Sequence, residues 1–242
     1  MQPMVVRLLA RIAACALIAA TPIATRAADV PAASAARTVP KADTESIRAW
    51  NREAFERYEA GETRRAIALF RRAADAGDAS ARYNVAVIRL RGESRSPSLN
   101  AAVTMLRSSA SAGFAPAQHM LGSLFESGRH VPVSQSEATE WFGRAARQGL
   151  VDAQLALATQ HYLGRGVPQD YALAARWYER AADGGDVAAQ YLIASMYHSG
   201  LGVKRDLRAA LDWYAAAARQ GDDAAREQAR LIADLLARER DS

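Results

Sequence analysis

The chain has four histidines, the side chains that could bind a metal ion or exchange a proton near neutral pH. They are His119, His130, His161 and His198. Each lies in, or just after, a different helix predicted by the pattern described below, and neighbouring helices pack about 8–10 Å apart. Because a metal–nitrogen bond is only about 2 Å long, this placement does not favour a shared metal ion. The sequence therefore predicts neither a metal site nor a bound cofactor.

A search for catalytic motifs also argues against an enzyme. The only lysines are Lys41 and Lys204, and neither stands three residues after a serine, so the Ser-x-x-Lys motif of serine β-lactamases is missing. The sequence has no His-Glu-x-x-His zinc motif, no Gly-x-Ser-x-Gly turn and no phosphate loop ending in Gly-Lys-Ser or Gly-Lys-Thr. We therefore predict a non-catalytic protein. An enzyme that acts on cell-wall or β-lactam material is the weakest alternative.

Three aromatic pairs could either stack on sugar rings or fill a hydrophobic core. They are Trp141-Phe142, Trp177-Tyr178 and Trp213-Tyr214. The pairs recur at one position of a repeated pattern, with the periodicity of buried residues. A shared packing role explains this recurrence, so we expect the pairs to lie in the core rather than to bind glycan.

A repeat of 36 residues predicts the elements that position these side chains. Two columns of identical residues keep this step without an insertion, namely Ala81, Ala117, Ala153, Ala189 and Ala225, and Gly77, Gly113, Gly149, Gly185 and Gly221. A fixed step of this length is typical of stacked repeats. Alanine is abundant and β-branched residues are scattered, which favours closely packed helices over sheets. The fold class is therefore predicted to be all-α.

The copy that begins at Ala153 predicts two helices joined by a tight loop. One face of the first helix contains Ala153, Leu157, Ala158 and His161. Glycines at positions 164 and 166 end that helix, and Asp170 is the expected N-cap of the second. The second helix has an apolar stripe of Ala174, Trp177, Tyr178, Ala181 and Ala182.

This pattern resembles the Sel-one-like repeat (SLR), a relative of the tetratricopeptide repeat. The resemblance rests on Ala-Gln in the first helix, Gly-x-Gly-Val in the loop, an Asp before the second helix, and Trp-Tyr followed by Ala-Ala. It implies an α-α solenoid of stacked helix-turn-helix repeats that forms a right-handed superhelix. The SLR repeats are expected at residues 79–114, 115–150, 151–186 and 187–223.

The two ends of the array are predicted to differ from these four copies. Residues 45–78 resemble a plain tetratricopeptide repeat, and residues 224–242 are expected to form a capping helix. The inward face of this helix is predicted to consist of Ala225, Ala229, Ile232 and Leu236. The loops at Gly92 and Gly128 depart from the Gly-x-Gly pattern, so we expect them to be less regular.

The first 27 residues have the pattern of an export signal. A basic start precedes an apolar run of about 13 residues and then small residues, which predicts a signal peptide at 1–27 and a periplasmic or secreted protein. Residues 28–44 are rich in Ala and Pro and are expected to be a flexible leader. Retention of the apolar run as a membrane anchor stays open. Lipid attachment at Cys15 is disfavoured because more apolar residues follow it.

Charge and cysteine content narrow the possible partners. Removal of residues 1–27 takes away three arginines and no acid, leaving 28 basic and 26 acidic residues. Basic and acidic residues alternate along the chain instead of forming a basic stripe, which argues against nucleic-acid binding. Because Cys15 is the only cysteine, the exported chain needs no disulfide and depends on packing for its stability.

The resemblance also implies a contact surface, because the first helices line the concave side of tetratricopeptide arrays. Two columns on these helices are richer in apolar and aromatic residues than a solvated face requires. They consist of Tyr83, His119, Leu155 and Tyr191, and of Leu90, Glu126, Tyr162 and His198. Small residues between the columns predict a trough that could hold an extended peptide or a helix of another protein.

Three functions remain open from the sequence. The favoured one is a scaffold or adaptor that binds other proteins of the bacterial cell envelope. The second is an accessory factor for polysaccharide export or cell-wall assembly that contacts glycan directly. The third is the enzyme considered above. The identity of the partner, the pathway and the oligomeric state do not follow from these residues.

Overall fold

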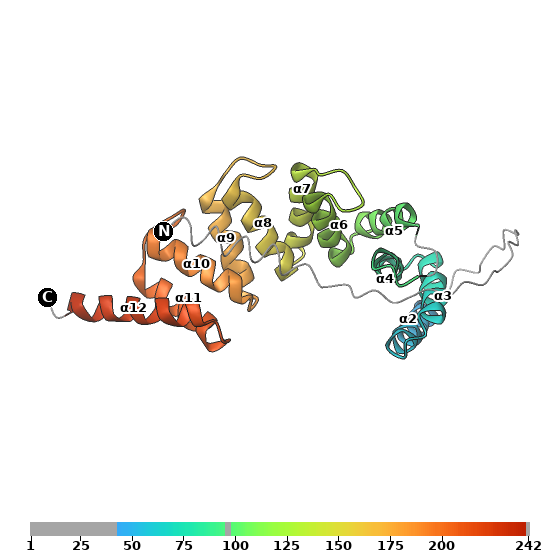
Figure 1. Ribbon diagram of the computed structural model, residues 1–242, viewed down its shortest axis with the longest axis horizontal. Helices are drawn as coiled ribbons and strands as arrows, with labels where there is room; N and C mark the ends of the chain where they lie inside the picture. The colour runs from blue at the N-terminus through green and yellow to red at the C-terminus, as the bar shows by residue number, and fades with distance from the viewer. Residues whose placement is uncertain (1–42, 95–97, 241–242) are drawn as a thin grey trace, which may run out of the picture. The chain divides into compact units, whose positions relative to one another are not determined.

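The computed structural model describes residues 43–94 and 98–240. The predicted signal peptide lies outside these residues, and so does nearly all of the leader. Within the described ranges every regular element is an α-helix. The all-α prediction is therefore confirmed, and helices are numbered from α2 as in Figure 1.

The chain forms two compact units. The N-terminal unit extends to Leu124 and includes residues 128–132, and the C-terminal unit comprises residues 125–127 and those from Val133 onward. The helices that begin in the N-terminal unit are α2 (Thr44–Glu59), α3 (Thr63–Asp75), α4 (Ala79–Leu90), α5 (Leu99–Ser111) and α6 (Ala115–Ser127). Those of the C-terminal unit are α7 (Gln135–Arg147), α8 (Val151–Leu163), α9 (Tyr171–Asp183), α10 (Val187–Ser199), α11 (Leu207–Arg219) and α12 (Asp223–Arg240).

Within each unit, successive helices pack against one another. In the N-terminal unit, α2 packs on α3, α3 on α4 and α4 on α5. In the C-terminal unit each helix from α7 to α12 packs on the next, as the ribbon of Figure 1 also shows. This is the stacking of helical hairpins that the 36-residue step predicts, because a hairpin buries its apolar stripe only against its neighbours. The predicted fold class of stacked helix-turn-helix repeats is confirmed.

Capping residues define where the second helices begin. The Asp170 carboxylate accepts a hydrogen bond from the Leu173 amide at 2.8 Å, as its predicted N-cap role requires. Asp206 occupies the same position one repeat later and accepts from the amides of Arg208 and Ala209. Each carboxylate thus satisfies amides that the first turn of a helix leaves without a partner.

Small and large side chains share the core, as predicted for the second helix of the best copy. Ala174, Ala181 and Ala182 are at most 2% exposed and Tyr178 is fully buried. The last helix buries Ala225 and Ile232 completely, which confirms its inward face at those positions. Alanine at the contact points lets neighbouring helices approach closely while aromatic rings fill the remaining volume.

Buried glutamines connect consecutive repeats by a hydrogen bond that recurs with the sequence period. Gln118, Gln154 and Gln190 occupy the same repeat position and are at most 8% exposed. Each side-chain amide donates to a backbone carbonyl near the end of the preceding second helix, at Ala110 (3.0 Å), Ala146 (3.3 Å) and Ala182 (3.2 Å). A buried amide needs such a partner, so the bond fixes the register of each first helix against the preceding repeat.

Two loop glycines allow one repeat to lie directly on the backbone of the repeat before it. Gly166 and Gly202 have φ angles of 69° and 71°. A Cβ atom at Gly166 would lie 2.3 Å from the backbone of Gln135, and one at Gly202 would lie 2.3 Å from the carbonyl oxygen of Tyr171. Both the left-handed angle and the close approach therefore require glycine.

The loop after α6 is more regular than its sequence suggests. Its first glycine, Gly128, has a φ angle of 71°, close to the 68° of Gly164 one repeat later. His130 occupies the position of Gly166 and adopts a φ angle of 63°, which a non-glycine residue seldom takes. The expectation of a less regular loop is thus wrong here. At the loop after Gly92, residues 95–97 lie outside the described part of the chain.

Candidate functional site

The residues of the two predicted contact columns lie on first helices in both units. In the N-terminal unit, Tyr83 and Leu90 lie on α4 and His119 lies on α6. In the C-terminal unit, Leu155 and Tyr162 lie on α8 and Tyr191 and His198 lie on α10, with Glu126 at the end of α6. We call Leu155, Tyr162 and His198, which are half-buried, the contact face of the C-terminal unit.

Tyr191 differs from the other members of its column because it lies in the core. Its side chain is 6% exposed, and its ring packs edge-to-face on Tyr214 of the same repeat, with 5.2 Å between ring centres. Burial raises the pKa of its phenol, which therefore stays neutral. A ring held in this way has almost no surface to offer a partner, so the contact face does not include Tyr191.

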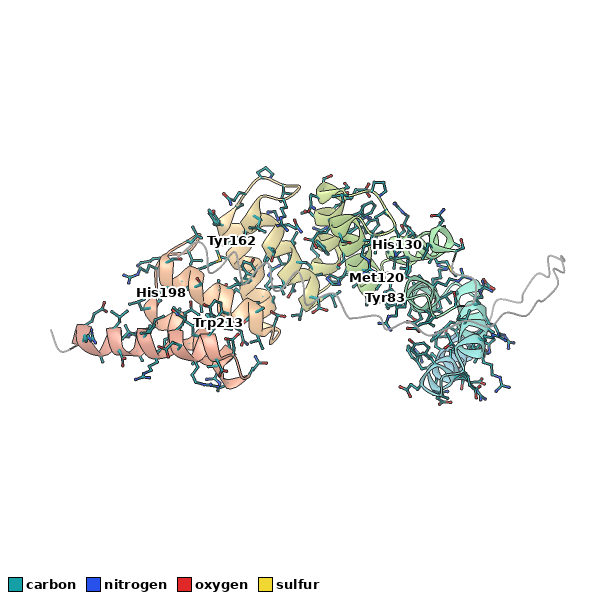
Figure 2. All side chains as sticks on the ribbon, viewed as in Figure 1. Tyr83, Met120, His130, Tyr162, His198 and Trp213 are labelled. Carbon is teal, nitrogen blue, oxygen red and sulfur yellow. The ribbon has the colours of Figure 1, made fainter. Side chains whose placement is uncertain are left out.

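Tyr162 is half-buried and packs against two other tyrosine rings. Its ring packs edge-to-face on Tyr171, at 5.2 Å between ring centres, and lies 6.3 Å from Tyr178. Burial raises the pKa of its phenol as well. Figure 2 labels Tyr162 on α8 and His198 on α10. A supported, half-buried tyrosine can give contact area and a hydroxyl donor with little loss of side-chain entropy.

Glu126 is positioned by two glutamines that the sequence pattern did not single out. The Gln160 side-chain amide donates to the Glu126 carboxylate at 2.7 Å, and the Gln135 amide donates to the Glu126 backbone carbonyl at 3.3 Å. Arg165 lies 3.9 Å from the same carboxylate. The other copies have an apolar residue at the position of the buried Gln160. This difference in the sequence could have indicated that Gln160 has a polar partner.

In the N-terminal unit, Tyr83 takes part in packing between consecutive first helices. Its ring lies edge-to-face on Phe114, with 5.4 Å between ring centres, and burial raises the pKa of its phenol. Phe114 is the residue just before α6. Tyr83, His119 and Leu90 are all half-buried, so this column is partly accessible within the N-terminal unit.

The second residue of each aromatic pair lies in the core. Phe142, Tyr178 and Tyr214 are at most 2% exposed, which confirms the predicted packing role for the second member of each pair. Trp177 is also buried, whereas Trp141 and Trp213 are half-buried. Arginines of their own helices cover two of these three tryptophan rings. Arg144 lies 4.3 Å from the centre of the Trp141 ring and Arg180 lies 4.6 Å from that of Trp177.

His161 packs within the fold. Its Nδ1 atom is buried and has no hydrogen-bond partner among the described residues. Burial lowers the pKa of its imidazole, although the charge of Asp170 opposes this effect. Throughout the described ranges, no group of three or more His, Cys, Asp or Glu side chains is arranged to hold a metal ion.

We expect His161 to make the protein less stable in mild acid. Because its pKa is lower in the folded state, the unfolded chain takes up the proton first as pH falls through about 6.5. The free energy of unfolding then decreases. This decrease should be smaller in His161→Phe, a variant that has the residue found at the same position one repeat earlier, Phe125. Urea denaturation of both proteins at pH 7.5 and pH 5.5 measures the difference. Equal losses in the two proteins would show that His161 makes no such contribution.

The chain matches a known repeat family and resembles solved structures of repeat proteins. The model of the Sel1 repeat matches residues 61–78, 79–114, 115–150, 151–186 and 187–222. No curated protein sequence matches the chain. None of the helices in the described ranges is long and apolar enough to cross a membrane.

Two solved structures resemble the chain over most of its length. One is c5321, a protective antigen present in uropathogenic Escherichia coli strains that displays an SLR fold. Its sequence is 30% identical to this chain and the TM-score is 0.71. The match covers 76% of this chain and 40% of that protein. The other is a Sel1 repeat protein from Oxalobacter formigenes, at 29% identity and a TM-score of 0.65, covering 69% and 49% of the two chains. The chain thus spans less than half the length of both proteins.

Proposed function

Because the chain belongs to the Sel1 repeat family of the tetratricopeptide-like superfamily, we propose that it is a non-catalytic scaffold that binds a partner protein through its first helices. Sel1 repeat proteins generally mediate protein–protein interactions, and their fold is typically an interaction scaffold. The search for catalytic motifs in the sequence agrees with this role.

The contact face of the C-terminal unit is the observation that supports this proposal most. Leu155, Tyr162 and His198 combine an aliphatic, an aromatic and an imidazole side chain, all partly accessible, on the first helices of two consecutive repeats. Between them, Thr159 and Ser195 are small. Large side chains around small ones can receive the side chains of an extended peptide or a helix.

The charges at this face suit a partner segment that is uncharged or has both apolar and polar residues. Burial lowers the pKa of His198, and the charge of Arg205 lowers it further, so the imidazole is neutral at pH 7. The carboxylate of Glu126 is already hydrogen-bonded to Gln160. Binding at this face therefore depends on apolar contact and hydrogen bonds rather than on ion pairs.

The export pattern of residues 1–27 supports a location in the bacterial cell envelope, with other envelope proteins as partners. An accessory role in polysaccharide export would also place the chain there. The protein-binding role is favoured because Arg144 and Arg180 cover the rings of Trp141 and Trp177, which leaves little surface on these two rings for sugars.

We expect Leu155→Glu combined with His198→Glu to weaken binding of the partner. The two substitutions place two negative charges in an apolar contact. The dissociation constant should rise at least tenfold, which corresponds to a loss of about 1.4 kcal/mol of binding free energy. The partner is first identified by photo-crosslinking in intact cells from position 155, followed by mass spectrometry. Its affinity for the purified chain and the variant is then measured by isothermal titration calorimetry.

A matched control separates this effect from added charge. Ala172→Glu combined with Ala233→Glu adds the same two charges at exposed alanines outside the contact columns. The control should bind the partner as the unaltered chain does, and far-ultraviolet circular dichroism should match for all three proteins. Unchanged affinity of the Leu155 and His198 variant would rule out this contact face.

A further inference from the structure

The C-terminal unit has an open cleft of about 670 Å³ that lies beside the last complete repeat. The loop after α10, the start of α11 and the end of α12 line it. Val203 and Leu236 form accessible apolar parts of the wall, and Leu207 is largely buried behind them. The basic lining residues are Lys204, Arg205 and Arg208, and the acidic ones are Asp206 and Glu239. This volume is within the range of sites that bind small molecules or short peptide segments.

Two of the basic residues in the cleft have no charge partner among the residues that the structure describes. Neither the Lys204 ammonium nor the Arg208 guanidinium forms an ion pair or side-chain hydrogen bond in the described part of the chain. Arg205 differs, because its Nε atom donates to the His198 carbonyl at 3.2 Å. The nearby Asp206 carboxylate accepts from two amides of α11. The cleft therefore presents two unpaired cations beside an apolar wall.

The basic residues are specific to this copy of the repeat. At the positions of Lys204, Arg205 and Arg208, the two preceding copies have uncharged residues. These are Pro132, Val133 and Ser136 in one copy, and Pro168, Gln169 and Ala172 in the other. The repeat fold forms without cations at these positions, so packing does not account for them.

We propose that this cleft binds an acidic peptide segment of a partner protein. Carboxylates of the segment pair with Lys204 and Arg208, and an apolar side chain of the segment packs against Val203 and Leu236. The site shares no side chain with the contact face, so either can exist without the other. Charge-assisted hydrogen bonds to carboxylates are the strong interactions that unpaired Lys and Arg side chains can form.

The geometry favours carboxylates on a peptide over a phosphate ion. Phosphate sites at helix ends rely on free backbone amides. Here Asp206 already occupies the amides of Arg208 and Ala209 at the start of α11. Recognition is therefore left to the two cationic side chains, and the apolar wall gives a phosphate ion nothing to contact.

Fluorescence anisotropy with two labelled peptides tests the site directly. The acidic probe alternates Asp and Glu with Leu and Phe over ten residues, and the neutral probe replaces each acid by Asn or Gln. The purified chain should bind the acidic probe at least tenfold more tightly at low salt, and added salt should weaken this binding. Inorganic phosphate at millimolar concentration should not displace the probe.

Two variants assign the binding to this cleft. Lys204→Gln with Arg208→Gln should lower the affinity for the acidic probe at least tenfold. Arg176→Gln with Arg219→Gln removes the same charge from exposed positions outside the cleft and should leave the affinity unchanged. Lys204→Pro with Arg208→Ala reproduces the residues at 168 and 172, which the preceding copy accommodates, and should also lose binding with the helical circular dichroism intact.

Three outcomes would overturn the proposal. They are equal affinity for the acidic and neutral probes, full binding by both cleft variants, and displacement of the probe by millimolar phosphate. The first would mean that carboxylates are not recognised. The second would place the binding elsewhere on the chain, and the third would identify the cleft as a phosphate site.

Discussion

Gly202→Ala should reduce the free energy of unfolding by about 3 kcal/mol or more. An added Cβ would lie 2.3 Å from the Tyr171 carbonyl oxygen, and a backbone atom at this distance cannot move away without shifting the start of α9. Alanine would also have to adopt a φ angle of 71°. Both effects destabilise the packing between two consecutive repeats. Urea denaturation followed by circular dichroism measures the loss.

Gly185→Ala is the matched control for this prediction. Gly185 has a φ angle of 89°, but nothing lies within 4 Å of a Cβ atom placed there. This substitution therefore reports the cost of the backbone angle alone, about 1–2 kcal/mol. Gly166→Ala, with a contact of 2.3 Å to Gln135, should resemble Gly202→Ala. Equal losses at positions 185 and 202 would show that the close approach between repeats contributes nothing.

Tyr214→Ala should reduce the free energy of unfolding by about 3–5 kcal/mol. The Tyr214 side chain is 2% exposed and packs edge-to-face on Tyr191, so its removal leaves a cavity between α10 and α11. The neighbouring Trp213 is half-buried, and Trp213→Ala should cost about 1–2 kcal/mol. Chemical denaturation of both variants gives the comparison.

Tyr214→Phe separates the ring from its hydroxyl. The phenylalanine ring keeps the packing against Tyr191 and should retain most of the stability, with a loss of about 1 kcal/mol for the hydroxyl. If Trp213→Ala proved as damaging as Tyr214→Ala, both members of the aromatic pair would be core residues. The division of this pair into a core ring and a half-buried ring would then be wrong.

Much of the fold follows from local sequence. The Asp170 carboxylate caps α9 by accepting a hydrogen bond from the Leu173 amide, three residues further along the chain. Gly164 ends the preceding helix because glycine adopts a left-handed backbone angle without steric cost. These interactions involve residues a few positions apart, so their presence in the sequence suffices to predict them. The 36-residue step then predicts the stacking, because each copy has the same unpaired apolar stripe.

The candidate sites were less predictable, because exposure depends on residues of other helices. The Gly166 contact with Gln135 and the Gln160 hydrogen bond to Glu126 join residues about thirty positions apart, and neither residue type reveals its partner. The cations of the cleft could have been noticed by comparing loop positions among the copies. That Lys204 and Arg208 line a cleft also depends on the position of α12.

The sequence by itself determined the helical class, the period, the helix ends and the apolar stripes, since these depend on residue type and spacing along one chain. Only the tertiary structure decided which side chains of the predicted columns remain accessible. Tyr83 and Tyr191 occupy the same repeat position and are both predicted to face a partner, yet Tyr191 is buried against Tyr214 while Tyr83 is half-buried. The physical reason is that exposure is set by the volume of the side chains on the neighbouring helix, which a residue's own position in the repeat does not specify.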